Sequence, residues 1–419
     1  MAFQVSPGVL VQEKDLTRII PAVSTSTGAF AGTFRKGPLD EVVTISSEQE
    51  LVSVFGKPDA GNFEDFFSAA NFLQYSNALR VVRVQNSSVS NATESGSSFV
   101  IKNLDDYTTN YADGSASVGQ WAARTAGAHG NSIAVHVCPS ATAYEQSNVT
   151  TVNDSATAAG DTVVTVTSGT GINVGDIVNF GDNYEYRVIA VNTNDLTIVR
   201  KDEPAHFTAS DSSGLFAAIT DGAQVRRRWK YYDLVRKAPG TSSYTSKAGG
   251  SGDEMHIVVV DEDGDISEKG AVLEVFDAVS KASDAKLAQG ETNYYPTVIQ
   301  NKSNYIFWMD HNAGGSNWGN AASGTTYTAV NTPTSESLSG GSNGSTVTTG
   351  QLKEWNVKYH KLIDRTFHNE STIKLTLEKK TISYSPGQIF SIGIKRYFHI
   401  QQGFYDSELC NGTTSFVGI

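Results

Sequence analysis

The sequence is poor in cysteine and has no long hydrophobic run. Its 419 residues contain two cysteines, which excludes a disulfide framework and a structural zinc cluster built on cysteines. No run of about 20 apolar residues occurs, so we expect no transmembrane helix and no membrane insertion. The start of the chain lacks a basic stretch followed by an apolar one, so we expect no secretory signal and a cytosolic origin.

Motifs for phosphate binding and zinc catalysis are also missing. Neither G-x-x-x-x-G-K-[ST] nor G-x-G-x-x-G occurs, and the eight histidines show no H-E-x-x-H spacing. His129, within Gly-Ala-His-Gly-Asn, is a conceivable general base, but this setting is more typical of a turn that opens a strand. We therefore expect a protein that is not an enzyme and that carries no cofactor.

Charge is scarce and its balance is acidic. Charged residues make up 18% of the chain, and 32 Lys and Arg stand against 44 Asp and Glu, for a net charge of −12. Broad nucleic-acid binding needs a positive surface, so no nucleic-acid partner is expected. The basic cluster Arg226-Arg227-Arg228 beside Trp229 leaves three alternatives: a phosphate or single-strand site, a solvated face, or a protein contact.

One acidic segment has the spacing of a calcium loop. Asp261, Asp263 and Asp265 occupy odd positions, as the first ligands of an EF-hand do. The closing glutamate is missing, because Val272 stands at position 12. An Asp-Gly turn of a hairpin is the better interpretation, and a metal site is the alternative.

Hydrophobic periodicity predicts an α+β class: a multidomain protein with a mixed α/β core domain and an inserted small antiparallel β-domain. Helical spacing favours helices at 47–56, 63–76 and 272–280, with strands at 79–84, 132–137, 255–260 and 305–309, and loops over 86–116 and 311–350. Short strands between 162 and 200, separated by Gly-Asp and Asn-Asp turns, indicate a small barrel or sandwich. The predicted divisions are an N-terminal strand arm at 1–20, an α/β region at 21–141, the inserted β-domain at 142–222, a second α/β region at 223–350, and an atypical segment at 351–419.

The composition changes abruptly near residue 356. The chain has 38 alanines before this point and none after it. Two explanations stay open at the sequence level: a frameshift or truncation in the gene, or a divergent terminus.

Several stretches together resemble the contractile tail sheath proteins of T4-like myoviruses. The order and spacing of these stretches carry the resemblance: Ser6-Pro7-Gly8-Val9, Thr27 to Phe34, Glu50 to Pro58, Phe66 to Val84, Ala238 to Ser242, Asp253 to Asp261 and Asn293-Tyr294-Tyr295. It covers roughly 1–140 and 230–350, and it fades after Leu352.

The resemblance implies a structural virion protein of a bacteriophage tail. Sheath subunits form hexameric rings, stack helically around a tail tube protein, meet baseplate and tail terminator proteins, and contract to drive the tube through the host envelope. It also implies a core domain built from both chain ends, and terminal arms that add strands to the sheets of neighbouring subunits. The matching N-terminal arm residues are Pro7, Gly8, Val9, Leu10 and Val11. The alternative is a virion decoration protein or adhesin whose β-module binds glycans.

Overall fold

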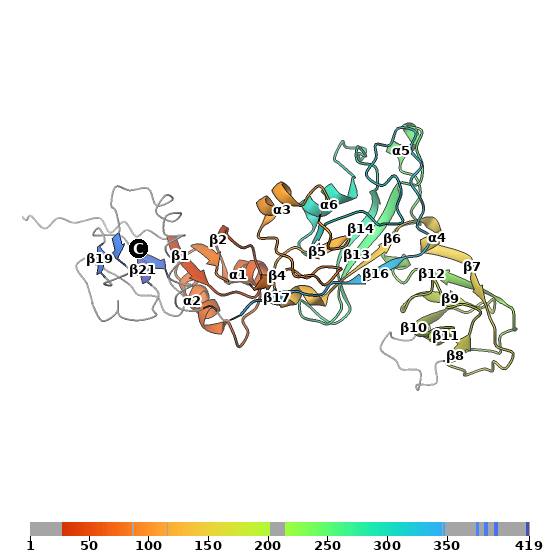
Figure 1. Cartoon of the computed structure of the whole chain (residues 1–419). Helices are drawn as coiled ribbons and strands as arrows, with labels where there is room; N and C mark the ends of the chain where they lie inside the picture. Colours follow the sequence, from red (N-terminus) through yellow and green to blue (C-terminus); the bar gives the residue numbers. More distant parts are fainter. Residues whose placement is uncertain are drawn as a thin grey trace, which may run out of the picture.

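The structure is a computed structural model that describes residues 27–85, 88–114, 116–201, 214–345 and 347, with four short strands further on. The predicted arm at 1–20 lies outside the described residues, as does most of the predicted segment 351–419. Figure 1 shows three sheet-containing regions that follow one another along an elongated molecule. No helix in the described ranges is both long enough and apolar enough to span a bilayer.

The first region is a small α/β layer, here called the N-terminal unit (residues 27–85). Its sheet has the order β1-β3-β2, with β1 parallel and β2 antiparallel to β3. Phe66, Ala69 and Ala70 of one helix recur at helical spacing and are buried against this sheet. The elements are β1 (Thr27–Gly32), β2 (Val42–Ile45), α1 (Glu48–Phe55), α2 (Phe63–Leu73) and β3 (Ala78–Arg83).

The N-terminus of α1 confirms the predicted helix start. Ser47 Oγ accepts a hydrogen bond from the Glu50 backbone N–H, as a capping box requires. The Glu50 carboxylate binds Ser46, at its N–H and hydroxyl, instead of the cap residue. The predicted helix at 63–76 is confirmed as α2, which ends earlier, at Leu73.

The second region is built on a four-stranded antiparallel sheet with the order β14-β13-β6-β16. Every residue of β13 is buried, which explains the continuous apolar run at 255–260. Its elements are β4 (Val89–Ser90), α3 (Leu104–Asn110), β5 (Trp121–Ala123), η1 (Ala128–Ser132), β6 (Ile133–Cys138), α4 (Ala141–Tyr144), η3 (Tyr232–Leu234), α5 (Ser243–Lys247), β13 (Glu254–Asp261), β14 (Ala271–Ser280), α6 (Tyr295–Lys302), β15 (Ile306–Trp308), β16 (Thr334–Ser337) and β17 (Ser342–Asn343).

Three predictions in this region were wrong. The segment 272–280 is the strand β14, not a helix. Its ladder with β13 shifts register twice, and one shift places Phe276 and Val279, three residues apart, opposite Ile257 and Met255. These two buried residues therefore have the spacing of a helix face. The two predicted loops also contain regular structure: β4 and α3 lie within 86–116, and β16 and β17 lie within 311–350.

The third region is a six-stranded sheet with the order β7-β12-β9-β10-β11-β8, here called the β-module (residues 145–228). All its ladders are antiparallel, and its apolar side chains form a hydrophobic cluster of their own. The strands predicted between 162 and 200 are therefore confirmed. The elements are β7 (Glu145–Thr151), β8 (Val163–Thr165), β9 (Ile177–Asn179), β10 (Tyr186–Asn192), β11 (Asp195–Arg200) and β12 (Gln224–Arg228).

Four short strands follow beyond residue 350. They form two antiparallel pairs, β18 with β19 and β20 with β21. Their bounds are β18 (Lys374–Thr376), β19 (Thr381–Ser383), β20 (Ile389–Ile392) and β21 (Phe416–Gly418). Helices and several sheets thus occur together, as the α+β prediction expected; the inserted-domain interpretation stays a prediction.

The two ends of the β-module lie side by side, which makes that interpretation testable. Glu145 pairs directly with Arg228, and the Trp229 N–H donates to the Tyr144 carbonyl at 2.8 Å. Replacing residues 146–227 by Asn-Gly should close this pair as a two-residue hairpin and leave the other regions folded. We expect one cooperative urea transition, followed by circular dichroism; an aggregated product or loss of cooperativity would contradict an independent β-module.

Candidate functional site

The predicted linking residues Pro7, Gly8, Val9, Leu10 and Val11 lie outside the described residues. Their role as an arm therefore stays a prediction. What the structure does describe is a sheet that such an arm could join, in the N-terminal unit. The candidate site is this sheet together with the contacts that hold it to the rest of the chain.

The sheet β1-β3-β2 has a ladder on one side only of each outer strand, within the part of the chain that is described. β1 pairs with β3 over six residues, from Thr27 with Ala78 to Gly32 with Arg83, and β2 pairs with the other side of β3. β20 lies close to β1 but forms no ladder with it. A strand edge of this kind offers backbone N–H and C=O groups to an added strand.

Two glycines let α2 lie directly on this sheet. A Cβ atom at Gly28 would come within 2.4 Å of the Phe72 ring of α2, and one at Gly32 within 3.2 Å of Asp65 Cβ of α2. Asp65 of α2 fixes the same contact, because its Oδ2 accepts from the Thr33 N–H at 2.7 Å and from the Thr33 hydroxyl at 2.6 Å. The position of the helix on the sheet is therefore determined by packing and by hydrogen bonds.

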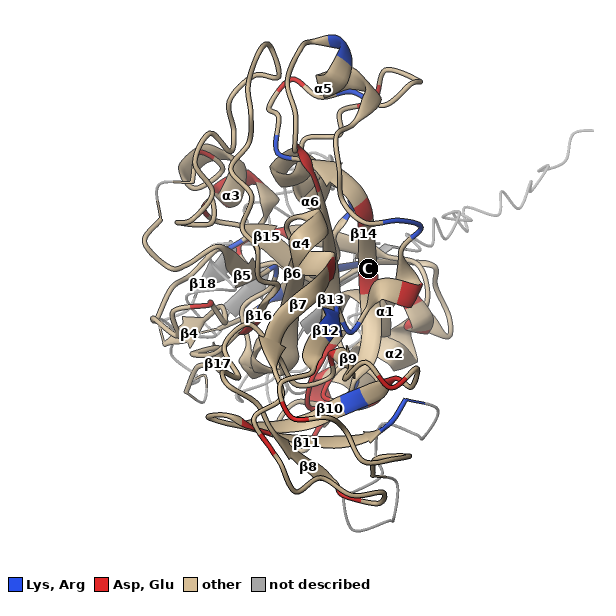
Figure 2. Ribbon diagram, turned by 90° about the vertical axis from the view of Figure 1, so that its right-hand side faces the viewer, with Lys and Arg blue, Asp and Glu red and all other residues tan. Residues whose placement is uncertain are grey.

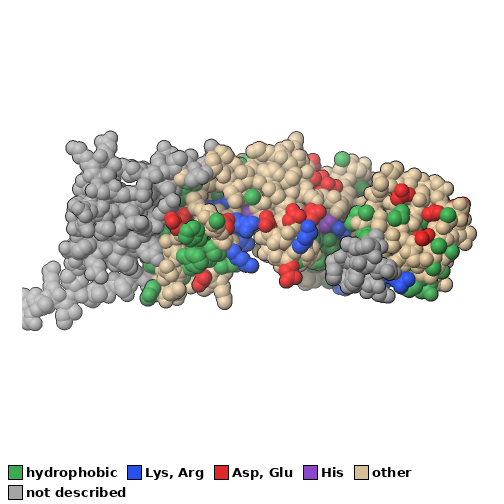
Figure 3. Space-filling model, turned by 90° about the horizontal axis from the view of Figure 1, so that it is seen from below, with side chains coloured by type: hydrophobic (Ala, Val, Ile, Leu, Met, Phe, Trp, Pro, Cys, Tyr) green, Lys and Arg blue, Asp and Glu red, His purple; other side chains and the backbone are tan. Residues whose placement is uncertain are grey.

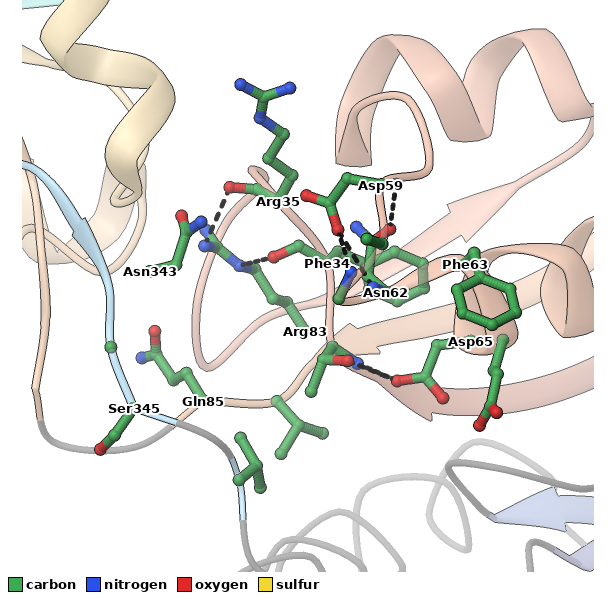
Figure 4. A pocket seen from close by; sticks show the side chains of 17 residues that line it. Phe34, Arg35, Asp59, Asn62, Phe63, Asp65, Arg83, Gln85, Asn343 and Ser345 are labelled. Atoms are coloured by element: carbon green, nitrogen blue, oxygen red, sulfur yellow. Dashed lines mark hydrogen bonds between the residues drawn. The ribbon is translucent and has the colours of Figure 1, made fainter.

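Arg83, the last residue of β3, joins the N-terminal unit to the second region. It is fully buried, and it donates to four backbone carbonyls: Nε to Phe34 at 3.0 Å, Nη1 to Gly37 at 2.9 Å and to Ala126 at 2.7 Å, and Nη2 to Arg35 at 3.2 Å. Figure 4 shows the bonds to Phe34 and Arg35. No carboxylate in the described ranges lies within ion-pair distance of it. Burial lowers the pKa of Arg83 to about 9, so it stays charged at neutral pH.

A cleft of about 380 Å³ lies beside Arg83, between the N-terminal unit and the segment that follows β17. One wall comes from the turn after β1 and the start of α2, and the other from residues 343–345 and 347 (Figure 4). Reciprocal hydrogen bonds between Asn131 and Gly341, of 3.0 and 2.7 Å, hold the returning segment in place, and the Ala128 N–H donates to Asn343 at 2.9 Å. The core domain built from both chain ends, which the resemblance implies, stays a prediction.

The histidine that was a conceivable general base is a buried structural residue. His129 lies in η1, and its Nε2 is 2.8 Å from the Thr125 hydroxyl. Burial and the nearby cations Arg83, Lys36 and Arg35 lower the pKa of His129 to about 3. The ring is therefore neutral at physiological pH and is enclosed by the fold.

The acidic segment at 261–265 is a capped turn between β13 and β14. Asp261 is buried and accepts hydrogen bonds from the Ser132 hydroxyl and from the N–H groups of Gly264, Ile266 and Ser267. Burial alone would raise the pKa of Asp261, but these hydrogen bonds hold it below its ordinary value. The described residues contain no group of three or more His, Cys, Asp or Glu placed to hold a metal ion.

The basic cluster of β12 is neutralised within the chain. Arg226 pairs with Glu145, and Arg228 pairs with Glu145 at 3.2 Å and Glu185 at 3.0 Å. Arg227 is buried, lies 3.8 Å from Asp176 and donates to the Thr142 carbonyl at 2.8 Å. Figure 2 shows this basic strand beside acidic neighbours. The cluster is therefore paired within the chain, and Arg227 links the β-module to α4.

Comparisons with known proteins identify the N-terminal unit most specifically. Residues 25–84 match the family described as "Tail sheath protein Gp18 domain III N-terminal region". The chain is 28% identical to the tail sheath protein of Salmonella phage ViI over 336 residues, which are 73% of this chain and 49% of that protein. It is 40% identical to the tail sheath protein of Enterobacteria phage T4 over 114 residues, 26% of this chain and 16% of that protein.

A solved structure, the sheath tail protein of Desulfitobacterium hafniense, aligns with 84% of this chain and 43% of that one, at 11% identity and a TM-score of 0.30. A likeness at this level carries no argument. The chain spans about half or less of the length of the curated relatives it matches. The sequence matches confirm the predicted resemblance to tail sheath proteins of T4-like phages.

Arg83→Met should test the joint between the regions. The variant leaves four buried carbonyls without a donor, so we expect the free energy of unfolding to fall by about 3 kcal/mol or more. Arg83→Lys should lower the free energy of unfolding by less than Arg83→Met does, because lysine keeps the charge. It should still lower it, because one ammonium nitrogen cannot reach all four carbonyls. Arg236→Met, at an exposed arginine, is the control in the same urea titration. Equal effects of Arg83→Met and the control would show that Arg83 is dispensable.

The buried histidines should make the fold acid-sensitive. The pKa of His129 and that of His136 are both lowered to about 3, mainly by burial. When the pKa of a histidine is lower in the folded chain than in the unfolded chain, its contribution to the free energy of unfolding is full above the unfolded pKa. This contribution decreases as the pH falls toward the folded pKa, because the unfolded chain then binds the proton more readily. Between pH 6.5 and 5, wild type should lose about 2 kcal/mol per histidine. In urea titrations at the two pH values, His129→Gln should lose less free energy of unfolding than wild type. An unchanged pH dependence would show that His129 is not buried as a neutral ring.

Proposed function

We propose that this protein is a structural subunit of a contractile bacteriophage tail sheath. One observation carries the proposal: the residues that match the tail sheath family model, 25–84, are those that build the sheet β1-β3-β2 with α1 and α2. The relatives named above are tail sheath proteins, which supports a virion location in the tail. The match thus falls on the candidate linking sheet.

Copies of the subunit would associate as hexameric rings stacked helically around a tail tube protein. Assembly would take place in the host cytoplasm, with the baseplate and tail terminator proteins at the two ends of the sheath. Contraction of the stacked rings would drive the tube through the host envelope and allow genome ejection. The work would come from repacking between subunits, without a cofactor, a nucleotide or a catalytic step.

Strand addition supplies the link between subunits in this proposal. Residues 7–11 of one copy would pair with an outer strand of the sheet β1-β3-β2 in a neighbour. Main-chain hydrogen bonds give such a contact its strength independently of side-chain identity. Pro7 suits the start of the added strand, where no N–H is needed. Because the arm is covalently part of its own subunit, the link would survive rotation of neighbouring subunits.

A decoration protein or adhesin with a glycan-binding β-module was the alternative. The relatives reported above are named tail sheath proteins, and neither name indicates an adhesin. The sheath function is therefore the better-supported proposal.

The arm can be tested by removing backbone donors from it. In the full chain, Val9→Pro with Val11→Pro removes two N–H groups and should abolish linkage between subunits, because an added strand cannot complete its ladder. Val9→Thr with Val11→Thr keeps the backbone donors and β-branching, and it should assemble like wild type. Sedimentation velocity at matched concentrations measures the assembled fraction.

Deleting residues 1–13 should give the same loss and leave a folded monomer. If the deletion unfolds the monomer, the segment pairs within its own chain and the linkage proposal fails. If the proline variant assembles as well as the threonine variant, strand addition by residues 7–11 is excluded.

A further inference from the structure

Helix α2 carries an aromatic stripe on the face turned away from its sheet. Phe63, Phe67, Asn71 and Tyr75 follow one another at intervals of four residues, which places them on one side of the helix axis. Phe63 is 48% exposed, Phe67 is 50% exposed, and Tyr75, just beyond the helix end, is 90% exposed. Figure 3 shows hydrophobic side chains gathered on this side of the N-terminal unit.

The stripe lies only partly against the subunit's own core. The buried face of α2 consists of Phe66, Ala69 and Ala70, which pack on the sheet. The Phe67 ring meets the Phe66 ring edge-on at a centroid distance of 5.5 Å, and half of Phe67 stays exposed. Two half-exposed phenylalanines one turn apart form a contiguous apolar surface, and such surfaces mark interaction sites on soluble proteins. The exposed charge beside the stripe is negative, because Glu64 is exposed, Asp65 is buried and α2 contains no Lys or Arg.

A cleft of opposite character lies between the N-terminal unit and the second region. It encloses about 540 Å³, and its wall carries four cationic side chains: Arg35, Lys36, Lys57 and Arg124. One carboxylate lines it, Asp265, which pairs with Arg35 at 3.3 Å. Among the described residues, no carboxylate lies within ion-pair distance of the other three cations.

The cleft also has an apolar component. Val52, Val54, Ile133 and Ile266 contribute to its lining, together with the ring of Tyr305. Burial lowers the pKa of Lys36, so this ammonium group lies in a partly desolvated position. The cleft therefore combines apolar surface with excess positive charge, and the stripe combines aromatic surface with negative charge.

We propose that the α2 stripe of one copy docks in the basic cleft of a second copy of this chain. Phe63 and Phe67 would fill the apolar part of the cleft, and Glu64 would face Lys57 at its rim. Both surfaces lie on this chain and complement each other in charge and in apolar character, so a second copy supplies the partner surface that each one fits. The inference rests on the proposed sheath function and names one contact within it.

Such a contact joins two different surfaces of the same chain. A contact of this kind is heterologous. Each copy can insert its stripe into one neighbour and accept the stripe of another in its cleft, so the association continues into rings or helical stacks. It differs from the arm contact, which uses main-chain pairing at a sheet edge. The two contacts can therefore be disrupted separately.

Charge reversal on the full chain tests which surfaces meet. Glu64→Lys alone places lysine against lysine, and Lys57→Glu alone places glutamate against glutamate, so each variant should associate about tenfold more weakly than wild type in sedimentation velocity. A one-to-one mixture of the two variants should recover association, because every contact in the mixture can then pair opposite charges. Glu48→Lys, at an exposed position on α1, is the matched charge control and should associate like wild type.

Removing the aromatic rings tests the apolar half of the contact. Phe63→Ser with Phe67→Ser should weaken association about tenfold or more. Both rings are half-buried and Phe67 contacts Phe66, so the urea midpoint should fall as well, and association is compared without urea, where circular dichroism shows the variant folded. Val174→Ser, at a 54% exposed position outside α2, is the matched control.

If wild type assembles and both the phenylalanine variant and the single charge variants assemble equally well, this inference is wrong and the sheath function stands. Failure of the mixture to recover would show that the charges act within one copy, which also overturns the docking contact. A wild-type chain that stays monomeric throughout contradicts the sheath function itself.

Discussion

The buried guanidinium of Arg83 is the interaction on which the arrangement of the chain depends. Three of its four acceptors belong to the turn that follows β1, and the fourth, Ala126, belongs to the second region. One side chain thereby fixes the end of β3, the turn and the neighbouring region at once. Gly127 allows this approach, because a Cβ there would lie 2.6 Å from the Arg35 carbonyl. The sheet and the basic cleft both take their geometry from this joint.

Buried cations that bind backbone carbonyls recur further along the chain. Lys281 donates to the carbonyls of Pro139 at 2.7 Å, Gly252 at 2.9 Å and Glu254 at 3.1 Å, and burial lowers its pKa to about 8. A cation held in this way satisfies several carbonyls that regular structure leaves unpaired. Gly252 and Glu254 lie at the start of β13 and Pro139 follows β6, so separation of these two segments would leave a buried charge without its acceptors.

The sequence allowed prediction of elements whose signals are local. The Ser47 cap predicted α1. The helical spacing of apolar residues predicted α2, at Phe63, Phe66, Ala70 and Leu73. Period-two alternation predicted the strands of the β-module. The assignment of β14 failed because its bulges change the spacing of buried residues from two to three. The joint at Arg83 could not be derived, because it brings together carbonyls of residues that are distant in sequence. The available signal was a charged residue, Arg83, between Val82 and Val84 of the predicted strand. The predicted arm at residues 7–11 remains to be tested.

The proposed function requires that copies of this chain polymerise as a tail sheath does. Electron microscopy of the purified full-length chain in negative stain tests it most directly. We expect rings or tubular polymers whose wall repeats a single subunit. A field of separate monomers at concentrations where sedimentation also shows no association would contradict the claim.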